Sequence, residues 1–94
     1  MTIETPVRRR LEIANVKGLH ARASAKLVEV VEAHDANAIV YKDGLSAAGD
    51  SIMGLLMLAA SIGTSIEVET SGAQARVLAD AIEALVADKF GEGN

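Results

Sequence analysis

Cysteine is absent from this chain, and aromatic residues are nearly so, because Tyr41 and Phe90 are the only two. Without thiols the protein can hold neither a disulfide framework nor a thiolate metal site. Half of the 94 residues are nevertheless hydrophobic, so the core has to be aliphatic, built from Ala, Leu, Ile and Val. A chain of this length is expected to form one domain over residues 1–94, structured from about 8 to 90 with short flexible termini.

An excess of positive charge and a long apolar run are missing as well. The formal net charge of −4 argues against non-specific binding of nucleic acid, which basic surfaces mediate. The most apolar stretch, residues 51–63, is shorter than the ~20 residues that a membrane-spanning helix needs. No apolar run follows a charged start at the amino terminus, so no signal peptide is predicted. We therefore expect a cytoplasmic protein that binds neither nucleic acid nor membranes.

Two periodicities follow one another along the sequence. Apolar and polar residues alternate, as in half-buried strands, over residues 8–15 and 65–70. Residues 36–43 are rich in branched side chains, which also indicates a strand, and residues 45–48 would form a short strand after the turn that follows. Apolar residues recur at helical spacing over residues 21–34, 51–61 and 73–90. The dipeptide Asp43-Gly44 is a hairpin signal. The order β-α-β-β-α-β-α, with one polar face on the strands, predicts an α+β fold in which helices cover one side of an antiparallel sheet.

The last two helices carry more specific expectations. Gly63 is expected to end the middle helix, in which one face is formed by Ile52, Leu55, Leu56 and Ala59, flanked by Met53 and Met57. Because apolar residues surround so short a helix, some of them are expected to stay exposed. The last helix has the strongest apolar face, and residues 91–94 after it are expected to form a frayed tail.

His20 places a titratable ring at the start of a predicted helix. The first backbone N–H groups of a helix lack partners within it, and together with the helix dipole they attract anions. Neutral imidazole is a competent nucleophile near pH 7, so the ring could accept a phosphoryl group whose oxygens these N–H groups bind. Arg22, in the first turn, could add a charge-assisted hydrogen bond. A phosphorus–nitrogen bond is labile, which suits a relay better than storage.

Simpler interpretations of these residues also exist. A single histidine near a helix cap is most often a surface residue, and His34, near the other end of the same helix, is given no functional role. No second histidine or carboxylate stands at ligand spacing, so we predict no metal site. We also find no acid–base partner for a hydrolytic triad. Capping is the simpler role for Ser51, with Asp50 as an equal candidate for the cap.

Two motifs resemble a known family. Residues 18–22, Gly-Leu-His-Ala-Arg, and residues 51–54, Ser-Ile-Met-Gly, have the order and spacing found in HPr, the histidine phosphocarrier of the phosphoenolpyruvate-dependent phosphotransferase system. A strand ending in a Gly turn follows, and the similarity runs over about residues 8 to 90. The resemblance implies an HPr-like open-faced β-sandwich, a four-stranded antiparallel sheet covered on one side by three helices.

The resemblance also implies roles for individual residues. His20 matches the histidine that is phosphorylated on Nδ1, and Arg22 matches the arginine beside the phosphate. Ser51 matches the serine that a dedicated kinase phosphorylates in some bacteria. The apolar surface that docks partner proteins would comprise Ala21, Ile52, Met53 and Leu56.

By the same resemblance, the protein takes a phosphoryl group from enzyme I and passes it to enzyme IIA, as a relay protein rather than a stand-alone enzyme. It needs no cofactor of its own, and a monomer is implied. Ala23 departs from the family, which usually has proline there. Glu29 and Glu32 stand where sugar-transport members often carry lysines, which leaves the identity of the matching enzyme I open. Residues 55–72 resemble the nitrogen-related branch, in which the relay regulates other proteins.

Two other functions stay open beside the phosphocarrier. In a regulatory interaction module, the apolar surface binds a target, and phosphorylation of His20 or Ser51 switches the binding. A small-ligand sensor domain would also suit the β-α-β-β-α-β order, although it leaves the pairing of His20 with Arg22 unexplained. The sequence does not decide between sugar uptake and nitrogen-type regulation.

Overall fold

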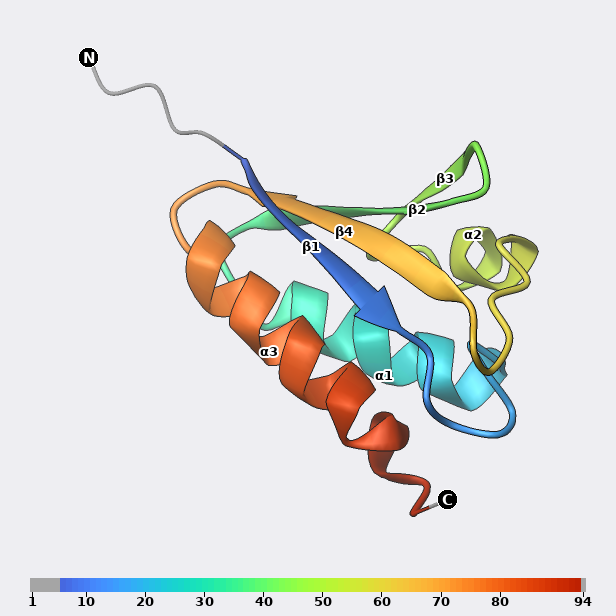
Figure 1. The fold of residues 1–94 in the computed structure, drawn as a ribbon. Helices are drawn as coiled ribbons and strands as arrows, with labels where there is room; N and C mark the ends of the chain where they lie inside the picture. The colour runs from blue at the N-terminus through green and yellow to red at the C-terminus, as the bar shows by residue number, and fades with distance from the viewer. Residues whose placement is uncertain (1–5, 94) are drawn as a thin grey trace.

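The computed structural model describes residues 6–93, which form one sheet with helices packed against it (Figure 1). In chain order the elements are β1 (Val7–Glu12), α1 (Ala21–Glu32), β2 (Asn37–Lys42), β3 (Leu45–Ala48), α2 (Ile52–Met57), β4 (Ser65–Ser71), α3 (Ala75–Ala87) and a short 3-10 helix, η1 (Lys89–Gly91). The predicted order is confirmed, with η1 as an addition. Residues 1–5, part of the segment in which no signal peptide was predicted, and Asn94 of the expected tail lie outside the described residues. Within residues 6–93, no helix has the length and apolarity needed to cross a membrane.

The sheet is antiparallel throughout, with the strand order β1-β4-β2-β3. The β2–β3 hairpin turns through Asp43 and Gly44, whose φ angles are 49° and 80°, as the hairpin signal requires. Helices α1 and α3 lie side by side under one face of the sheet, and the opposite face is left uncovered (Figure 1). The predicted α+β class and the open-faced β-sandwich are therefore confirmed.

Alternation along the strands gives the sheet its two different faces. Val40, Ile66 and Val68 point toward the helices, and each is at most 1% exposed. Glu67 and Glu69 alternate with them on β4 and point to the uncovered face. Burying one such aliphatic side chain stabilises the fold by ~1.5–3 kcal/mol. Because every second residue of a strand points to the same face, this alternation decides which face of the sheet the helices cover.

The core between the sheet and the helices is aliphatic, as the scarcity of aromatic residues requires. Leu27 of α1 and Leu78 and Ile82 of α3 are fully buried at helical spacing. Phe90, the one large aromatic ring in this cluster, closes the core beyond the end of α3 and is also fully buried. The strong apolar face predicted for residues 73–90 is thus confirmed over α3, whereas the helix ends at Ala87 and Phe90 reaches the core from outside it.

Helix α2 is shorter than the sequence predicts, because it ends at Met57 and not near Gly63. Ala59, with a φ angle of 52°, already lies outside the helix, so the expected four-residue face including Ala59 is wrong. The chain leaves the helix to bond with the loop before α1: the Leu19 N–H donates to the Ala60 carbonyl at 2.8 Å, and the Gly63 N–H to the Ile13 carbonyl at 2.9 Å. These bonds replace the helical ones that residues 58–63 would otherwise make.

The frayed tail predicted after α3 is wrong for Gly91 and Glu92. Lys89, Phe90 and Gly91 have φ angles of 56°, 54° and 75°, and these three left-handed residues turn the chain back toward α1. The buried Phe90 ring anchors the turn, and Lys26 Nζ on α1 donates to the Phe90 carbonyl at 2.6 Å. The tail is therefore fixed through both the side chain and the backbone of Phe90, and it brings Glu92 to the start of α1.

Candidate functional site

His20 is the cap of helix α1, as its place in the sequence predicts. Its backbone is extended, and its Nδ1 atom accepts a hydrogen bond of 3.3 Å from the backbone N–H of Arg22. A capping side chain satisfies one of the helix N–H groups that lack an intrahelical partner. Because Nδ1 is the acceptor in this bond, it carries a lone pair rather than a proton, as a nucleophile must.

The loop before His20 is held rigidly by backbone contacts. Gly18 has a φ angle of 64°, and a Cβ atom at this position would lie 2.4 Å from the Ala60 carbonyl oxygen. Only glycine allows this approach. The approach lets the Leu19 N–H bond to Ala60, and the buried Ser24 hydroxyl donates to the Leu19 carbonyl at 3.1 Å. The position of His20 is therefore set by the chain on both sides of it.

A cleft of about 260 Å³ opens beside the His20 ring, and three of the side chains that line it are basic: Lys17, Arg22 and Lys26. Gly91 and Glu92 of the returning tail complete the lining. The His20 side chain is 27% exposed, so a partner can reach it while the loop still holds it. Three cations at a helix start favour a small anion such as a phosphoryl group.

Glu92 is a site residue that the sequence does not predict. Its carboxylate contacts His20 Nε2, and it also accepts a hydrogen bond of 3.0 Å from Asn15 Nδ2. The sequence indicated no acid–base partner for His20, whereas the structure places this carboxylate beside its ring. Glu92 stands 72 positions from His20, so no local spacing reveals the contact. The one signal in the sequence that the tail turns back toward the core is Phe90-Gly91, an apolar residue and a turn residue directly before Glu92.

The electrostatics of the cleft keep Glu92 ionised. The hydrogen bond from His20, reinforced by the one from Asn15, holds the pKa of the Glu92 carboxyl below its ordinary value of 4.5. The charge of Lys17 acts in the same direction, whereas partial burial opposes the shift. Near neutral pH the His20 ring therefore faces a carboxylate on its Nε2 side and a backbone N–H on its Nδ1 side.

His34, the second histidine, has a different environment. It lies two residues beyond the end of α1, and its Nδ1 atom contacts the carbonyl of Val30 at 2.7 Å. It does not line the cleft at His20. Among residues 6–93, no three histidine, cysteine, aspartate or glutamate side chains are grouped as metal ligands would be.

Ser51 caps helix α2, which decides between the two candidates for that cap. Its Oγ atom accepts a hydrogen bond of 3.0 Å from the Gly54 N–H, whereas Asp50 is exposed. On the helix that follows, Ile52 and Met53 are 40% and 70% exposed. This confirms that some apolar side chains of so short a helix stay exposed, because α2 packs mainly against α1 and β3 and cannot bury every side.

The predicted docking residues differ in how far they are exposed. Ala21 on α1 and Ile52 and Met53 on α2 are exposed, whereas Leu56 is half-buried. Met57, which flanks them, is 75% exposed. Because the loop after α2 is bonded to Leu19, directly before His20, this apolar surface belongs to the same end of the molecule as the cleft.

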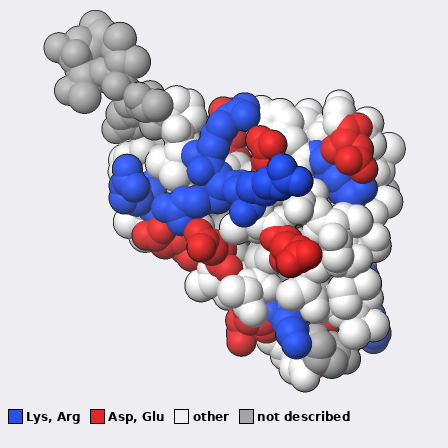
Figure 2. Space-filling model, viewed as in Figure 1, with Lys and Arg blue, Asp and Glu red and all other residues white. Residues whose placement is uncertain are grey.

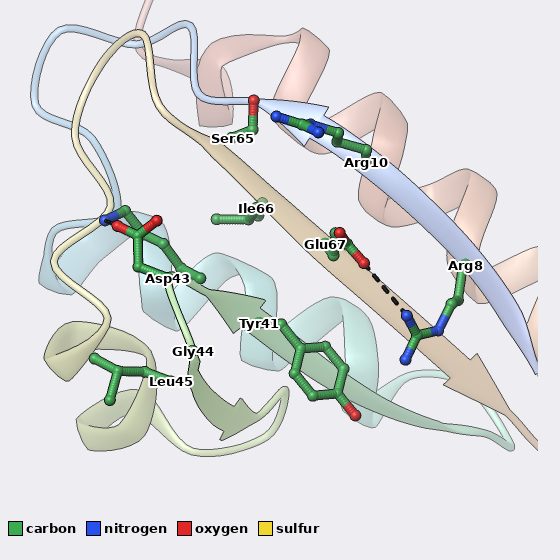
Figure 3. Close-up of a pocket in the computed structure, with 10 residues that line it drawn as sticks. Arg8, Arg10, Tyr41, Asp43, Gly44, Leu45, Ser65, Ile66 and Glu67 are labelled. Atoms are coloured by element: carbon green, nitrogen blue, oxygen red, sulfur yellow. Dashed lines mark hydrogen bonds and ion pairs between the residues drawn. The ribbon is translucent and has the colours of Figure 1, made fainter.

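A second hollow, of about 340 Å³, lies on the uncovered face of the sheet between Arg8, Tyr41 and Leu45 (Figure 3). Basic side chains gather over β1, with acidic ones directly beside them (Figure 2). Arg8 pairs with Glu69 at 2.8 Å and with Glu67 at 3.4 Å. Its charge is thus already balanced, and no histidine lines the hollow. The small-ligand sensor therefore gains no support from it.

An open-faced β-sandwich whose first helix is capped by a histidine in a basic cleft defines a class: small proteins that carry a phosphoryl group on a side chain. Comparisons with known proteins agree. The family model described as "PTS HPr component phosphorylation site" matches residues 7–88. The chain therefore belongs to the HPr family, and it is a phosphocarrier of the phosphotransferase system.

Individual relatives cover nearly the whole chain. It is 41% identical to the phosphocarrier protein HPr of Cupriavidus necator, over 93% of this chain and 98% of the relative. It is 38% identical to the phosphocarrier protein NPr of Escherichia coli K12, over 92% of this chain and 97% of that relative. The crystal structure of HPr from Thermoanaerobacter tengcongensis superimposes with a TM-score of 0.87 at 31% identity, covering 92% of this chain and 97% of that one. Both HPr and NPr names thus occur among its relatives.

The cap of α2 yields a prediction about stability. Replacing Ser51 with alanine leaves the Gly54 N–H without its partner, and we expect a loss of about 1 kcal/mol in the free energy of unfolding. The neighbouring change Asp50→Ala, on an exposed side chain, should cost about 0.5 kcal/mol or less. Urea denaturation of both variants measures the difference. Equal losses would show that Ser51 Oγ is not the cap.

Proposed function

We propose that His20 is the residue that carries the phosphoryl group, taking it from phospho-enzyme I on Nδ1 and passing it to an enzyme IIA domain. The observation that supports this most is the direction of the ring. Nδ1 has its lone pair turned to the start of α1, in a cleft with three basic side chains. We place this phosphoryl transfer in the cytoplasm, where the protein would meet both enzyme I and enzyme IIA.

The transfer needs few parts from this chain. The Nδ1 lone pair attacks phosphorus while the bond between phosphorus and the donor breaks, so no water or cofactor is consumed. The Arg22 N–H leaves Nδ1 as the new bond forms and can then donate to a phosphoryl oxygen. The guanidinium of Arg22 supplies a second, charge-assisted bond to the transferred group. Orientation and charge thus come from the start of α1, and the larger partners supply the rest.

Loss of the His20 ring should abolish labelling. With phosphoenolpyruvate and enzyme I, the wild type should gain one acid-labile, base-stable phosphoryl group, detected by intact mass spectrometry. His20→Ala should gain none. The matched control is His34→Ala, which removes the other ring and should be labelled like the wild type. Labelling that persists in His20→Ala, or an unlabelled wild type, would contradict the proposal.

The apolar surface of Ala21, Ile52, Met53 and Leu56 is proposed to dock both partners in turn. Its support is the exposure of Met53 and Ile52 beside the cleft, and methionine adapts well to several partner surfaces. A charge in the centre of such an interface is costly. Met53→Glu should therefore raise the KM for this protein in the enzyme I reaction by at least about tenfold.

The control for this change is Val77→Glu, which places the same charge on α3 at a side chain that is 54% exposed. Its KM should stay at the wild-type value. Equal effects of the two variants would remove the docking role from α2. A target protein that still binds His20→Ala but loses Met53→Glu would favour the alternative function, an interaction module that phosphorylation switches.

Ser51 is proposed as a regulatory phosphorylation site, because it directly follows the exposed Asp50 and directly precedes the docking surface. A phosphate there adds about −1.5 to −2 charge, which would repel acidic partners and slow transfer to His20. Incubation with the serine kinase and ATP should add a phosphate that Ser51→Ala lacks. An unmodified wild type would overturn this role.

The oligomeric state that we propose is a monomer, as the resemblance to the family implies. A dimer of HPr from Thermoanaerobacter tengcongensis also resembles this chain, with a TM-score of 0.73 at 32% identity over 98% of this chain and all of the other. Because the chain is similar both to a relative named HPr and to one named NPr, sugar uptake and nitrogen-type regulation both stay open as its role.

A further inference from the structure

The carboxylate of Glu92 is held against His20 by more than their mutual attraction. One of its oxygens contacts His20 Nε2, and the other accepts from Asn15 Nδ2 at 3.0 Å. The Glu92 side chain is only 13% exposed. Asn15 is fully buried, and its Nδ2 atom also donates to the Gly18 carbonyl at 2.8 Å. The carboxylate is therefore tied to the loop that positions the histidine.

This arrangement carries a cost that stability alone does not explain. Asn15 Oδ1 is buried and has no hydrogen-bond partner among the described residues, and an unpaired buried acceptor is unfavourable. Both neighbours of Nδ2 are acceptors, so the amide cannot be reversed without losing both bonds. The left-handed turn through Lys89, Phe90 and Gly91 adds backbone strain at the first two positions. The tail nevertheless holds one carboxylate against Nε2.

We propose that Glu92 is a positioning residue for phosphoryl transfer, which holds the proton of His20 on Nε2 and so keeps Nδ1 as the nucleophile and the phosphorylated ring in its transferable form. This inference rests on His20 as the residue that carries the phosphoryl group. A buried carboxylate that orients a histidine and stabilises its cationic form is a known device in other enzymes.

The proton on Nε2 matters in both directions of transfer. When Nδ1 of the neutral ring attacks phosphorus and the donor bond breaks, Nε2 keeps its proton and the ring becomes a phosphoimidazolium cation, which the Glu92 carboxylate stabilises. When the acceptor then attacks phosphorus, the P–Nδ1 bond breaks and its electron pair returns to Nδ1, giving neutral imidazole. If Nε2 had lost its proton, imidazolate would have to leave instead, and the bond would be much less labile.

Other charged groups around the ring do not replace this role. Lys17, Arg22 and Lys26 also line the cleft, but they are cations and cannot accept the Nε2 proton. The charge of Lys17 acts on the Glu92 carboxylate itself, and Arg22 meets Nδ1 through its backbone N–H. Lys26 is in addition engaged with the Phe90 carbonyl. Glu92 is therefore the one anion among the side chains that line the cleft.

The test compares the phosphorylated full-length wild type with Glu92→Gln, which keeps the shape and a hydrogen-bond acceptor but removes the charge. Two rates are measured from pH 5 to 9: transfer to an enzyme IIA domain, and spontaneous hydrolysis. In Glu92→Gln the pH at which both rates decline should fall by about one unit. Because a drop of one unit in the pKa of the phosphorylated ring lowers its protonated fraction by up to tenfold, transfer at pH 8 should slow by up to about tenfold.

The control is Glu83→Gln, which removes the same charge from α3, where Glu83 pairs with Arg9 at 2.6 Å. Its pH profile should match that of the wild type. A Glu92→Gln profile equal to the wild type, with normal labelling, would overturn the role of Glu92 and leave His20 as the carrier. A change in unfolding free energy with no shift in the pH profile would assign Glu92 a structural role only. An unlabelled wild type would instead contradict the carrier itself.

Discussion

The close approach of Gly18 to Ala60 is the constraint on which the functional site depends. A Cβ atom at Gly18 would come within 2.4 Å of the Ala60 carbonyl oxygen, so only glycine lets the two segments bond. That bond fixes Leu19, and Leu19 fixes the residue that follows it as the cap of α1. The early end of α2 has the same origin, because residues 60–63 give up helical bonds to hold this loop. The position of the His20 ring is therefore decided by the backbone, before any side chain of the cleft is considered.

From that position, two opposite contacts give the ring its chemistry. The Arg22 N–H meets Nδ1, and the Glu92 carboxylate meets Nε2. The first contact identifies the nitrogen with a free lone pair, and the second holds the proton on the other nitrogen. A protein of this size has little interior for a conventional active site. It therefore builds one at its surface, from a helix start and a returning tail anchored by Phe90.

Most of the fold and part of the site could be predicted from the sequence, because they depend on patterns among residues close together in the chain. The period of two on β4 and the helical spacing of Leu78 and Ile82 are enough to derive the layers, and Asp43-Gly44 identifies the hairpin. His20 and Arg22 are found because they are neighbours at a helix start. Glu92 could not be found, because its partner is 72 positions away and the turn that brings it there depends on burial of Phe90. The end of α2 was wrong for the same kind of reason, since a tertiary bond to Ala60 outweighs local helix propensity.

Nitrogen-15 NMR of the phosphorylated protein tests the central claim most directly, because it reports which nitrogen of which histidine holds phosphorus and which holds a proton. The account predicts a His20 ring with phosphorus on Nδ1 and a proton on Nε2 at neutral pH, and an unmodified His34 ring. Phosphorus on Nε2 of His20, the atom that Glu92 contacts, would contradict it, as would phosphorus on any other residue.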